Sequence, residues 1–130
     1  MSVIAVDFDG CLCENDFPRI GRAKRDVIEA LVRRQADGDR VILWTCRSGV
    51  MLDDAVLWCL NRGLKFDAVN DNLPENVERY HNNCRKVWAD EYWDDHAICV
   101  GGQSDICAWK RTQTAARDGW RERLARWWKR

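Results

Sequence analysis

The stretch Val3-Ile4-Ala5-Val6-Asp7-Phe8-Asp9-Gly10 decides the fold of this chain. Residues 2–6 include a short apolar run rich in β-branched side chains, which is typical of a buried strand. The run stops at two carboxylates and a glycine, residue types that favour a loop. The sequence therefore predicts a strand near the N-terminus that ends in a pair of acidic side chains.

The rest of the chain alternates predicted helices with further apolar runs. Apolar residues keep helical spacing over residues 19–36 and again over residues 52–60. Short strands are predicted at residues 41–44, 66–69, 87–93 and 97–100, a turn at residues 70–74, and a helical segment from residue 105 onward. Parallel strands need crossover connections, usually helices, so this order predicts an α/β protein with a mainly parallel sheet.

The length and composition indicate one domain. The chain has 130 residues, so we expect a single-domain, Rossmann-like three-layer fold over residues 1–130, with a core at residues 1–102 and a C-terminal helical segment at residues 103–130. Lys and Arg together number 21, as do Asp and Glu, so the basic excess of nucleic-acid-binding proteins is lacking. No apolar run approaches the roughly 18 residues of a membrane span, and no secretory signal is evident, so we expect a cytoplasmic protein without membrane partners.

The seven cysteines are odd in number and form no CxxC pair. This pattern argues against a disulfide scaffold or a zinc site, and the presence of only two histidines argues the same way. We expect the cysteines to be reduced and mostly buried, with Cys46 as the one that faces a functional site.

Polar and charged side chains follow the predicted strands at the points where the strands end. Asp7 and Asp9 follow the first strand, and Thr45 follows the strand at residues 41–44. Asp94-Asp95 follows the later strand, which Lys86 precedes. Because ligands of parallel α/β sheets gather at the carboxyl ends of the strands, we expect these groups to converge on one edge of the sheet.

This ordered set resembles the motifs of the haloacid dehalogenase (HAD) superfamily of phosphotransferases. The first motif of the family, Asp-x-Asp-x-(Thr/Val)-(Leu/Val) after a strand, is similar to residues 7–12, with Cys11 in place of the usual Thr or Val. The other three motifs are a Thr or Ser at a strand end, a Lys and an acidic pair, and they match Thr45, Lys86 and Asp94-Asp95 in the family's order. The resemblance runs from residue 1 to about residue 102 and implies a HAD-like fold.

A narrower resemblance is to small, uncharacterised HAD-like hydrolases of bacteria and phages. That subgroup carries Trp-Thr-Cys-Arg, Phe-Asp-Ala-Val-Asn and Lys-x-x-Ala-Asp-x-Tyr-x-Asp-Asp, which match residues 44–47, 66–70 and 86–95. The intervals between the motifs are short, so the likeness is to members without a cap domain. Their open site often admits bulky substrates or is closed by a neighbouring subunit, which leaves a homo-oligomer open as an arrangement of this chain.

The resemblance implies a Mg²⁺-dependent phosphatase that hydrolyses phosphomonoesters. Asp7 would be the nucleophile that forms an aspartyl-phosphate, and Asp9 would be the general acid and base. Thr45 and Lys86 would bind the phosphoryl oxygens, and Lys86 would also hold Asp7 ionised. The identity of the phosphorylated substrate does not follow from the motifs.

The same resemblance implies a magnesium site. Mg²⁺ is a hard cation that prefers oxygen ligands, and it would offset the repulsion between a carboxylate nucleophile and an anionic phosphoryl group. The implied ligands are Asp7, the backbone carbonyl of Asp9, and Asp94. Asp95 would be either a further ligand or an acceptor of hydrogen bonds behind the ligands.

Five other polar residues are candidates for the site. Arg47 has a planar guanidinium that suits a second anionic group of the substrate, or it forms a surface salt bridge. Asn70 and Asn72 could bind polar groups of the substrate, although turn formation is the commoner role of such residues. Asp90 and Glu91 compete for the metal role and rank lower, because they lie inside the predicted strand.

Residues 117–130 combine basic side chains with tryptophans at helical spacing. This segment predicts either an amphipathic helix that packs on its own domain or on a dimer mate, or a contact to nucleic acid or a membrane surface. Two alternatives to the phosphatase therefore stay open. One is a polynucleotide 3′-end phosphatase that uses the same residues, and the other is a regulatory module that binds metal without turnover.

Overall fold

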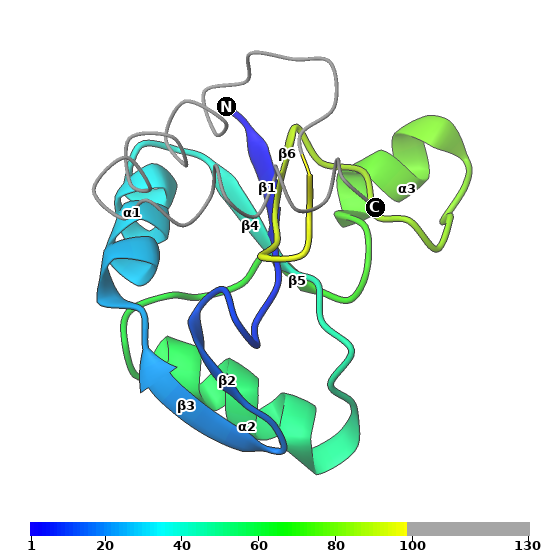
Figure 1. The fold of residues 1–130 in the computed structure, drawn as a ribbon. Helices are drawn as coiled ribbons and strands as arrows, with labels where there is room; N and C mark the ends of the chain where they lie inside the picture. The colour runs from blue at the N-terminus through cyan, green and yellow to red at the C-terminus, as the bar shows by residue number, and fades with distance from the viewer. Residues whose placement is uncertain (99–130) are drawn as a thin grey trace, which may run out of the picture. The chain divides into compact units, whose positions relative to one another are not determined.

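The strand predicted at the N-terminus lies inside a parallel sheet (Figure 1). The structure, a computed structural model, describes residues 1–98. The sheet has four strands in the order β5-β4-β1-β6, with the bounds Ala68–Val69, Arg40–Leu43, Val3–Val6 and Glu91–Trp93. Every pair of neighbouring strands is parallel, which confirms the prediction of an α/β protein with a mainly parallel sheet and is compatible with a Rossmann-like fold.

Both faces of β1 are buried, as its continuous apolar run indicates. Ile4 and Val6 are fully buried and point to the face opposite Val3 and Ala5, because successive side chains of a strand alternate. Helix α1 (Arg25–Ala36) packs against β4 and buries Leu31. One face of the sheet carries a cluster of buried side chains: Val3, Ala5, Ile42, Leu73, Val87 and Ala89.

Residues 19–23 form a strand, and the prediction of a helix over residues 19–36 is wrong for this part. Strand β2 (Cys13–Asp16) and strand β3 (Arg19–Ala23) make an antiparallel hairpin, and the helix begins only at Arg25. Apolar residues at positions 20 and 23 fit a helical spacing equally well, so the sequence pattern was ambiguous. Gly21 favours the hairpin because a Cβ there would collide with the backbone carbonyl of Glu14.

Several other elements differ from their predicted bounds. Helix α2 (Gly49–Leu60) begins three residues before the predicted start. Helix α3 (Pro74–Tyr80) is a short helix that was not predicted, and its proline occupies a first-turn position, where no backbone N–H is needed. Strand β5 keeps only two residues of the predicted strand at 66–69, and β6 keeps three of those at 87–93.

Residues Met1–Ala97 form one compact unit. Residues 97 and 98 are not in a strand, and the remainder of the strand predicted at 97–100 lies outside the described residues. So do the C-terminal helical segment predicted at residues 103–130 and its basic, tryptophan-containing part. Within residues 1–98, no helix is both long enough and apolar enough to cross a membrane.

The five cysteines among the described residues form no disulfide bonds. Cys13 and Cys59 are buried, whereas Cys46 and Cys84 are exposed. The prediction that the cysteines are mostly buried is therefore wrong for this part of the chain. The prediction that Cys46 faces a functional site stays a prediction.

Replacement of Leu31 by alanine tests the packing of α1 on the sheet. Leu31 is fully buried, so Leu31→Ala should lower the free energy of unfolding by about 2–5 kcal/mol, through lost apolar burial and an unfilled cavity. Denaturant unfolding monitored by circular dichroism measures the change. Leu60→Ala is the matched control, because Leu60 also lies in a helix but is 50% exposed, and it should cost well under about 1 kcal/mol.

Candidate active site

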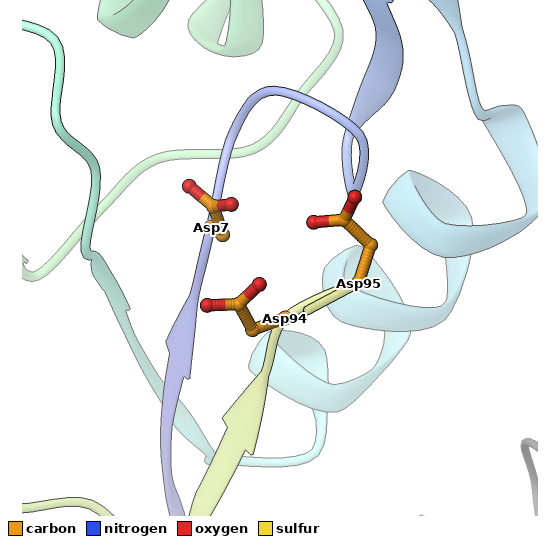
Figure 2. Close-up of side chains that lie close together, drawn as sticks. All are labelled: Asp7, Asp94 and Asp95. Atoms are coloured by element: carbon orange, nitrogen blue, oxygen red, sulfur yellow. The ribbon is translucent and has the colours of Figure 1, made fainter. Parts of the chain in front are cut away.

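Three carboxylates meet at the carboxyl edge of the sheet, where β1 and β6 end side by side (Figure 2). Asp7 directly follows β1, and Asp94 and Asp95 directly follow β6. The backbone N–H of Asp7 donates a 2.9 Å hydrogen bond to the carbonyl of Trp93, so the pairing of the two strands continues up to the site. One oxygen from each carboxylate lies within 4.8 Å of the others. The predicted convergence of these three acids is therefore confirmed.

The surroundings of Asp7 disfavour the charged form of its carboxyl. Burial raises its pKa from 3.8 to about 6, a shift that the backbone N–H of Phe8, 2.8 Å away, partly opposes. The charges of Asp94, Asp95 and Asp9 raise the pKa further. The expectation that Lys86 holds Asp7 ionised stays a prediction.

The close approach of Asp95 to the loop after β1 depends on a glycine. Gly10 has a φ of +84°, and a Cβ at this position would collide with the carboxylate of Asp95. Only glycine accepts both this backbone conformation and this neighbour without displacement. Gly10 therefore lets the loop after β1 lie directly against the acidic pair after β6.

The three carboxylates fit a divalent cation with hard oxygen ligands. Carboxylate oxygens are the donors that Mg²⁺ prefers, and the acids repel one another without a cation between them. The raised pKa of Asp7 reports the same repulsion together with burial. These residues can hold such an ion, with Asp7, Asp94 and Asp95 as its protein ligands.

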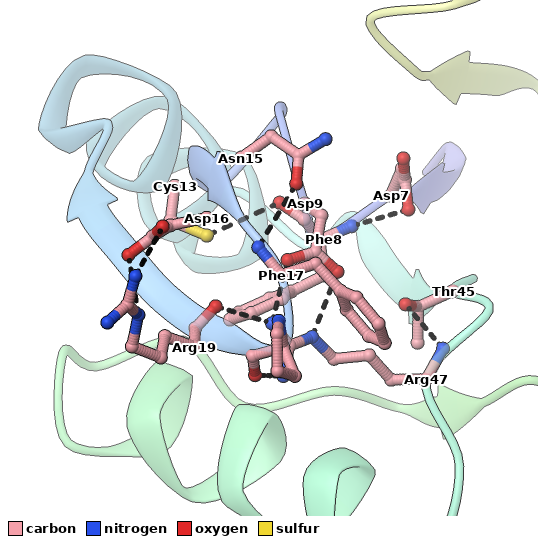
Figure 3. A network of polar contacts seen from close by, with 11 residues as sticks. Asp7, Phe8, Asp9, Cys13, Asn15, Asp16, Phe17, Arg19, Thr45 and Arg47 are labelled. Atoms are coloured by element: carbon pink, nitrogen blue, oxygen red, sulfur yellow. Dashed lines mark hydrogen bonds and ion pairs between the residues drawn. The ribbon is translucent and has the colours of Figure 1, made fainter.

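Asp9 points to a different partner from Asp7 (Figure 3). Its two carboxylate oxygens accept hydrogen bonds from Nη2 and Nε of Arg47, at 2.8 Å and 2.9 Å. The Arg47 side chain is 1% exposed, and the Asp9 side chain is 18% exposed. Arg47 was predicted either to bind a second anion of the substrate or to form a surface salt bridge. It forms a salt bridge with Asp9, and this salt bridge is buried rather than on the surface.

Thr45 lies at the end of β4, next to the carboxylates in sheet order. Its hydroxyl oxygen accepts a 3.1 Å hydrogen bond from the backbone N–H of Arg47, which leaves the hydroxyl hydrogen able to donate. Its own N–H donates a 2.7 Å hydrogen bond to the side-chain oxygen of Asn70. Asn70, predicted to bind substrate, therefore holds Thr45 in place in this structure.

Asn72 is a structural residue in this arrangement, although it was also predicted to bind substrate. It is 5% exposed. Its side-chain nitrogen donates to Asn83 at 2.9 Å and to the carbonyl of Cys84 at 3.1 Å, and its oxygen accepts from the N–H of Trp88 at 2.7 Å. These bonds use its amide to join the loop after β5 to the segment before β6.

Lys86 is exposed and precedes β6. Its ammonium lies 5.3 Å from the centre of the Tyr92 ring. Among the described residues no ion pair joins Lys86 to Asp7. The role of Lys86 on phosphoryl oxygens stays a prediction.

Asp90 and Glu91, the two lower-ranked candidates for binding the metal, are not part of the acidic cluster. Asp90 accepts a 2.7 Å hydrogen bond from the N–H of Val3, at the opposite end of the sheet from Asp7. Glu91 forms a 3.0 Å ion pair with Arg34.

Sequence reasoning missed two residues that shape the site. Lys24 donates a 2.7 Å hydrogen bond from its ammonium to the carbonyl of Gly10 and so fastens the loop after β1. No signal in the sequence marks Lys24, because it falls within a predicted helix. Gly10 belongs to the opening motif, but its contact with Asp95 depends on the pairing of β1 with β6.

The fold and the site define an α/β protein with an acidic cluster at the carboxyl edge of its parallel sheet. Among solved structures, the chain is similar to a conserved protein coded by a locus of Bacteroides thetaiotaomicron. The two chains share 36% sequence identity, with 88% of this chain and 91% of the other covered, and a TM-score of 0.69. This chain belongs to the same family as that conserved protein. No family model matches the chain, and no curated protein matches it.

A pair of glycine variants tests the contact between Gly10 and Asp95. With Mg²⁺ as the predicted ligand of the cluster, Gly10→Ala should weaken its binding about 10-fold or more, because the new methyl group displaces a carboxylate of the cluster. Gly63→Ala is the matched control, since Gly63 has the same φ of +84° but open space where the added methyl group would lie. Both variants should lose about 1–2 kcal/mol of stability from backbone strain. Isothermal titration calorimetry with Mg²⁺ separates them, and equal affinities would contradict the role of Gly10.

Asp7→Asn tests whether the charged form of Asp7 destabilises the folded protein. Between pH 3.8, where an unfolded aspartate titrates, and about pH 6, Asp7 keeps its proton in the folded parent but loses it in the unfolded chain. The stability of the parent therefore falls as the pH rises through this window. Above it, Asp7→Asn should be more stable than the parent in chelator by about 1–2 kcal/mol, a value reduced for partial exposure. Denaturant unfolding across pH measures the difference. The exposed Asp53→Asn should show no such gain, and a parent as stable as Asp7→Asn at neutral pH would contradict the prediction.

Proposed function

We propose that this protein is a Mg²⁺-dependent phosphatase that hydrolyses phosphomonoesters through an aspartyl-phosphate on Asp7. The observation that supports this function best is the meeting of Asp7, Asp94 and Asp95 within 4.8 Å beside the end of β4, where Thr45 lies. The resemblance of the same residues to the HAD motifs supports it independently. The substrate is a phosphorylated small molecule or macromolecular end.

Asp7, Asp94 and Asp95, together with the backbone carbonyl of Asp9, are the proposed ligands of Mg²⁺. A bound Mg²⁺ offsets the negative charge of the carboxylates and of an incoming phosphoryl group. In its absence the raised pKa of Asp7 leaves a larger share of this carboxyl protonated below about pH 6 than its ordinary pKa would, and the protonated acid is a poor nucleophile. The cluster of acids therefore links the ionisation of Asp7 to the cation.

Asp7 attacks the phosphorus of the substrate, and the bond from phosphorus to the leaving oxygen breaks. Asp9 lies two residues further along the loop and serves as the proton donor to poor leaving groups. It then accepts a proton from the water that hydrolyses the aspartyl-phosphate. The two hydrogen bonds from Arg47 fix the position of the Asp9 side chain in this loop.

Thr45 and Lys86 are the proposed partners of the phosphoryl oxygens. The hydroxyl oxygen of Thr45 accepts a hydrogen bond from the backbone N–H of Arg47. The hydroxyl hydrogen is left to donate to a phosphoryl oxygen. Lys86 brings a positive charge on a flexible side chain. Stabilisation of charge on these oxygens is a large part of phosphoryl-transfer catalysis.

Hydrolysis of para-nitrophenyl phosphate in Mg²⁺ and in chelator tests the proposal. The parent should turn over only with Mg²⁺, and Asp7→Asn should lower kcat by at least about 10³-fold, because the nucleophile is lost. Asp53→Asn, an exposed acid on α2, should retain the parent's rate. Acid-quenched parent should carry one phosphoryl group on Asp7, detected by mass spectrometry.

Two outcomes would contradict the proposal. Equal rates for the parent and Asp7→Asn would remove Asp7 as the nucleophile. Mg²⁺ binding without turnover on a broad panel of phosphomonoesters would favour the regulatory module instead.

A further inference from the structure

The contacts of Arg47 connect three segments of the chain beside Asp9 (Figure 3). Arg47 itself follows β4. Its Nε and Nη2 bind both oxygens of Asp9, which lies in the loop after β1. Its Nη1 donates a 3.1 Å hydrogen bond to the carbonyl of Pro18, and Nη2 donates a 2.9 Å hydrogen bond to the carbonyl of Arg19. The last two carbonyls belong to the tip of the β2–β3 hairpin.

The guanidinium of Arg47 is engaged by the chain rather than presented to a substrate. All three guanidinium nitrogens donate hydrogen bonds to the chain, and the side chain is 1% exposed. The guanidinium carbon lies 5.0 Å from the centre of the Phe8 ring and 5.1 Å from that of the Phe17 ring. The guanidinium is therefore surrounded by two aromatic rings and by its hydrogen-bond partners. Any effect of Arg47 on the reaction must pass through Asp9 or the hairpin.

We propose that Arg47 is a positioning residue that orients Asp9 for the hydrolysis of the aspartyl-phosphate and ties this orientation to the tip of the β2–β3 hairpin. The inference rests on the proposed phosphatase function and deepens it. Two hydrogen bonds to the two oxygens of one carboxylate fix both the position and the plane of the group. Each oxygen keeps a further lone pair that can accept a proton.

The second step of the reaction needs this orientation most. Water attacks the phosphorus, the bond from phosphorus to the Asp7 oxygen breaks, and the proton of the water passes to a carboxylate oxygen of Asp9. The products are inorganic phosphate and the free carboxylate of Asp7. In the first step an aryl leaving group departs without a proton, so with an aryl phosphate only the second step depends on Asp9.

Rapid-mixing kinetics of Arg47→Lys and Arg47→Ala with para-nitrophenyl phosphate and Mg²⁺ test the proposal. Both variants should show a burst of one nitrophenolate per enzyme, followed by a steady state about 10- to 100-fold slower than that of the parent. Because only the second step is slowed, kcat and KM should fall together and kcat/KM should stay at the parent's value. Millimolar guanidinium should restore part of the lost rate in Arg47→Ala, since it can occupy the vacated space.

Arg40→Ala is the matched control. Arg40 also pairs with two carboxylates, those of Asp67 and Glu75, each at 3.1 Å, but it lies at the opposite end of β4 from Thr45. Its loss should leave kcat and KM unchanged and produce no burst. Hydrogen exchange should increase over residues 13–23 in both Arg47 variants and not in Arg40→Ala.

The possible results separate the roles of Arg47. Equal losses of kcat and kcat/KM in folded variants, without a burst, would mean a merely structural residue and would overturn the inference. A loss of kcat/KM with kcat retained would mean that Arg47 grips the substrate, and this too would overturn it. If Arg47→Ala does not fold, Arg47→Lys gives the same readouts. An inactive parent would overturn the proposed function and this inference with it, whereas an active parent with either failed pattern overturns the inference alone.

Discussion

The parallel pairing of β1 with β6 is the constraint on which the site depends. The hydrogen bond from the N–H of Asp7 to the carbonyl of Trp93 brings the ends of the two strands together, and with them three carboxylates. Like charges at this separation repel, and burial of Asp7 adds to the cost. The apolar side chains of β1 on both faces of the sheet supply the opposing free energy. In the absence of a cation, the raised pKa of Asp7 lets a proton relieve the repulsion, so a proton and a metal ion compete for the same oxygens.

Two aspartates separated by one residue have opposite surroundings. Asp7 faces other acids, and Asp9 faces the buried guanidinium of Arg47. In the turn after β1, Gly10 with its positive φ lies against Asp95, whereas the side chain of Asp9 pairs with Arg47. In the proposed phosphatase, the nucleophile and the proton-transfer group would need different electrostatic environments, and the loop after β1 provides two such environments.

The strands and the acids were predictable because the signals that mark them are local. The apolar runs of β1 and β4 are bounded by polar residues, and the carboxylates follow strand ends directly. The β2–β3 hairpin was not predictable, because residues 19–23 carry a spacing that fits a helix as well as a strand. The roles of Asn70 and Asn72 were also hidden, since an asparagine in a turn looks the same whether it binds a ligand or a neighbouring backbone N–H.

The sequence by itself determined the fold class, the order along the chain of the strands that end in candidate site residues, and the residues that form the acidic cluster. Tertiary structure alone decided which side chains face one another across the site: that Asp95 lies against Gly10, and that Arg47 is buried on Asp9. The reason is physical. Periodicity and turn chemistry act between residues a few positions apart, whereas Arg47 and Asp9 are 38 positions apart in the chain. Such contacts form only once the sheet has brought the strands that carry them together.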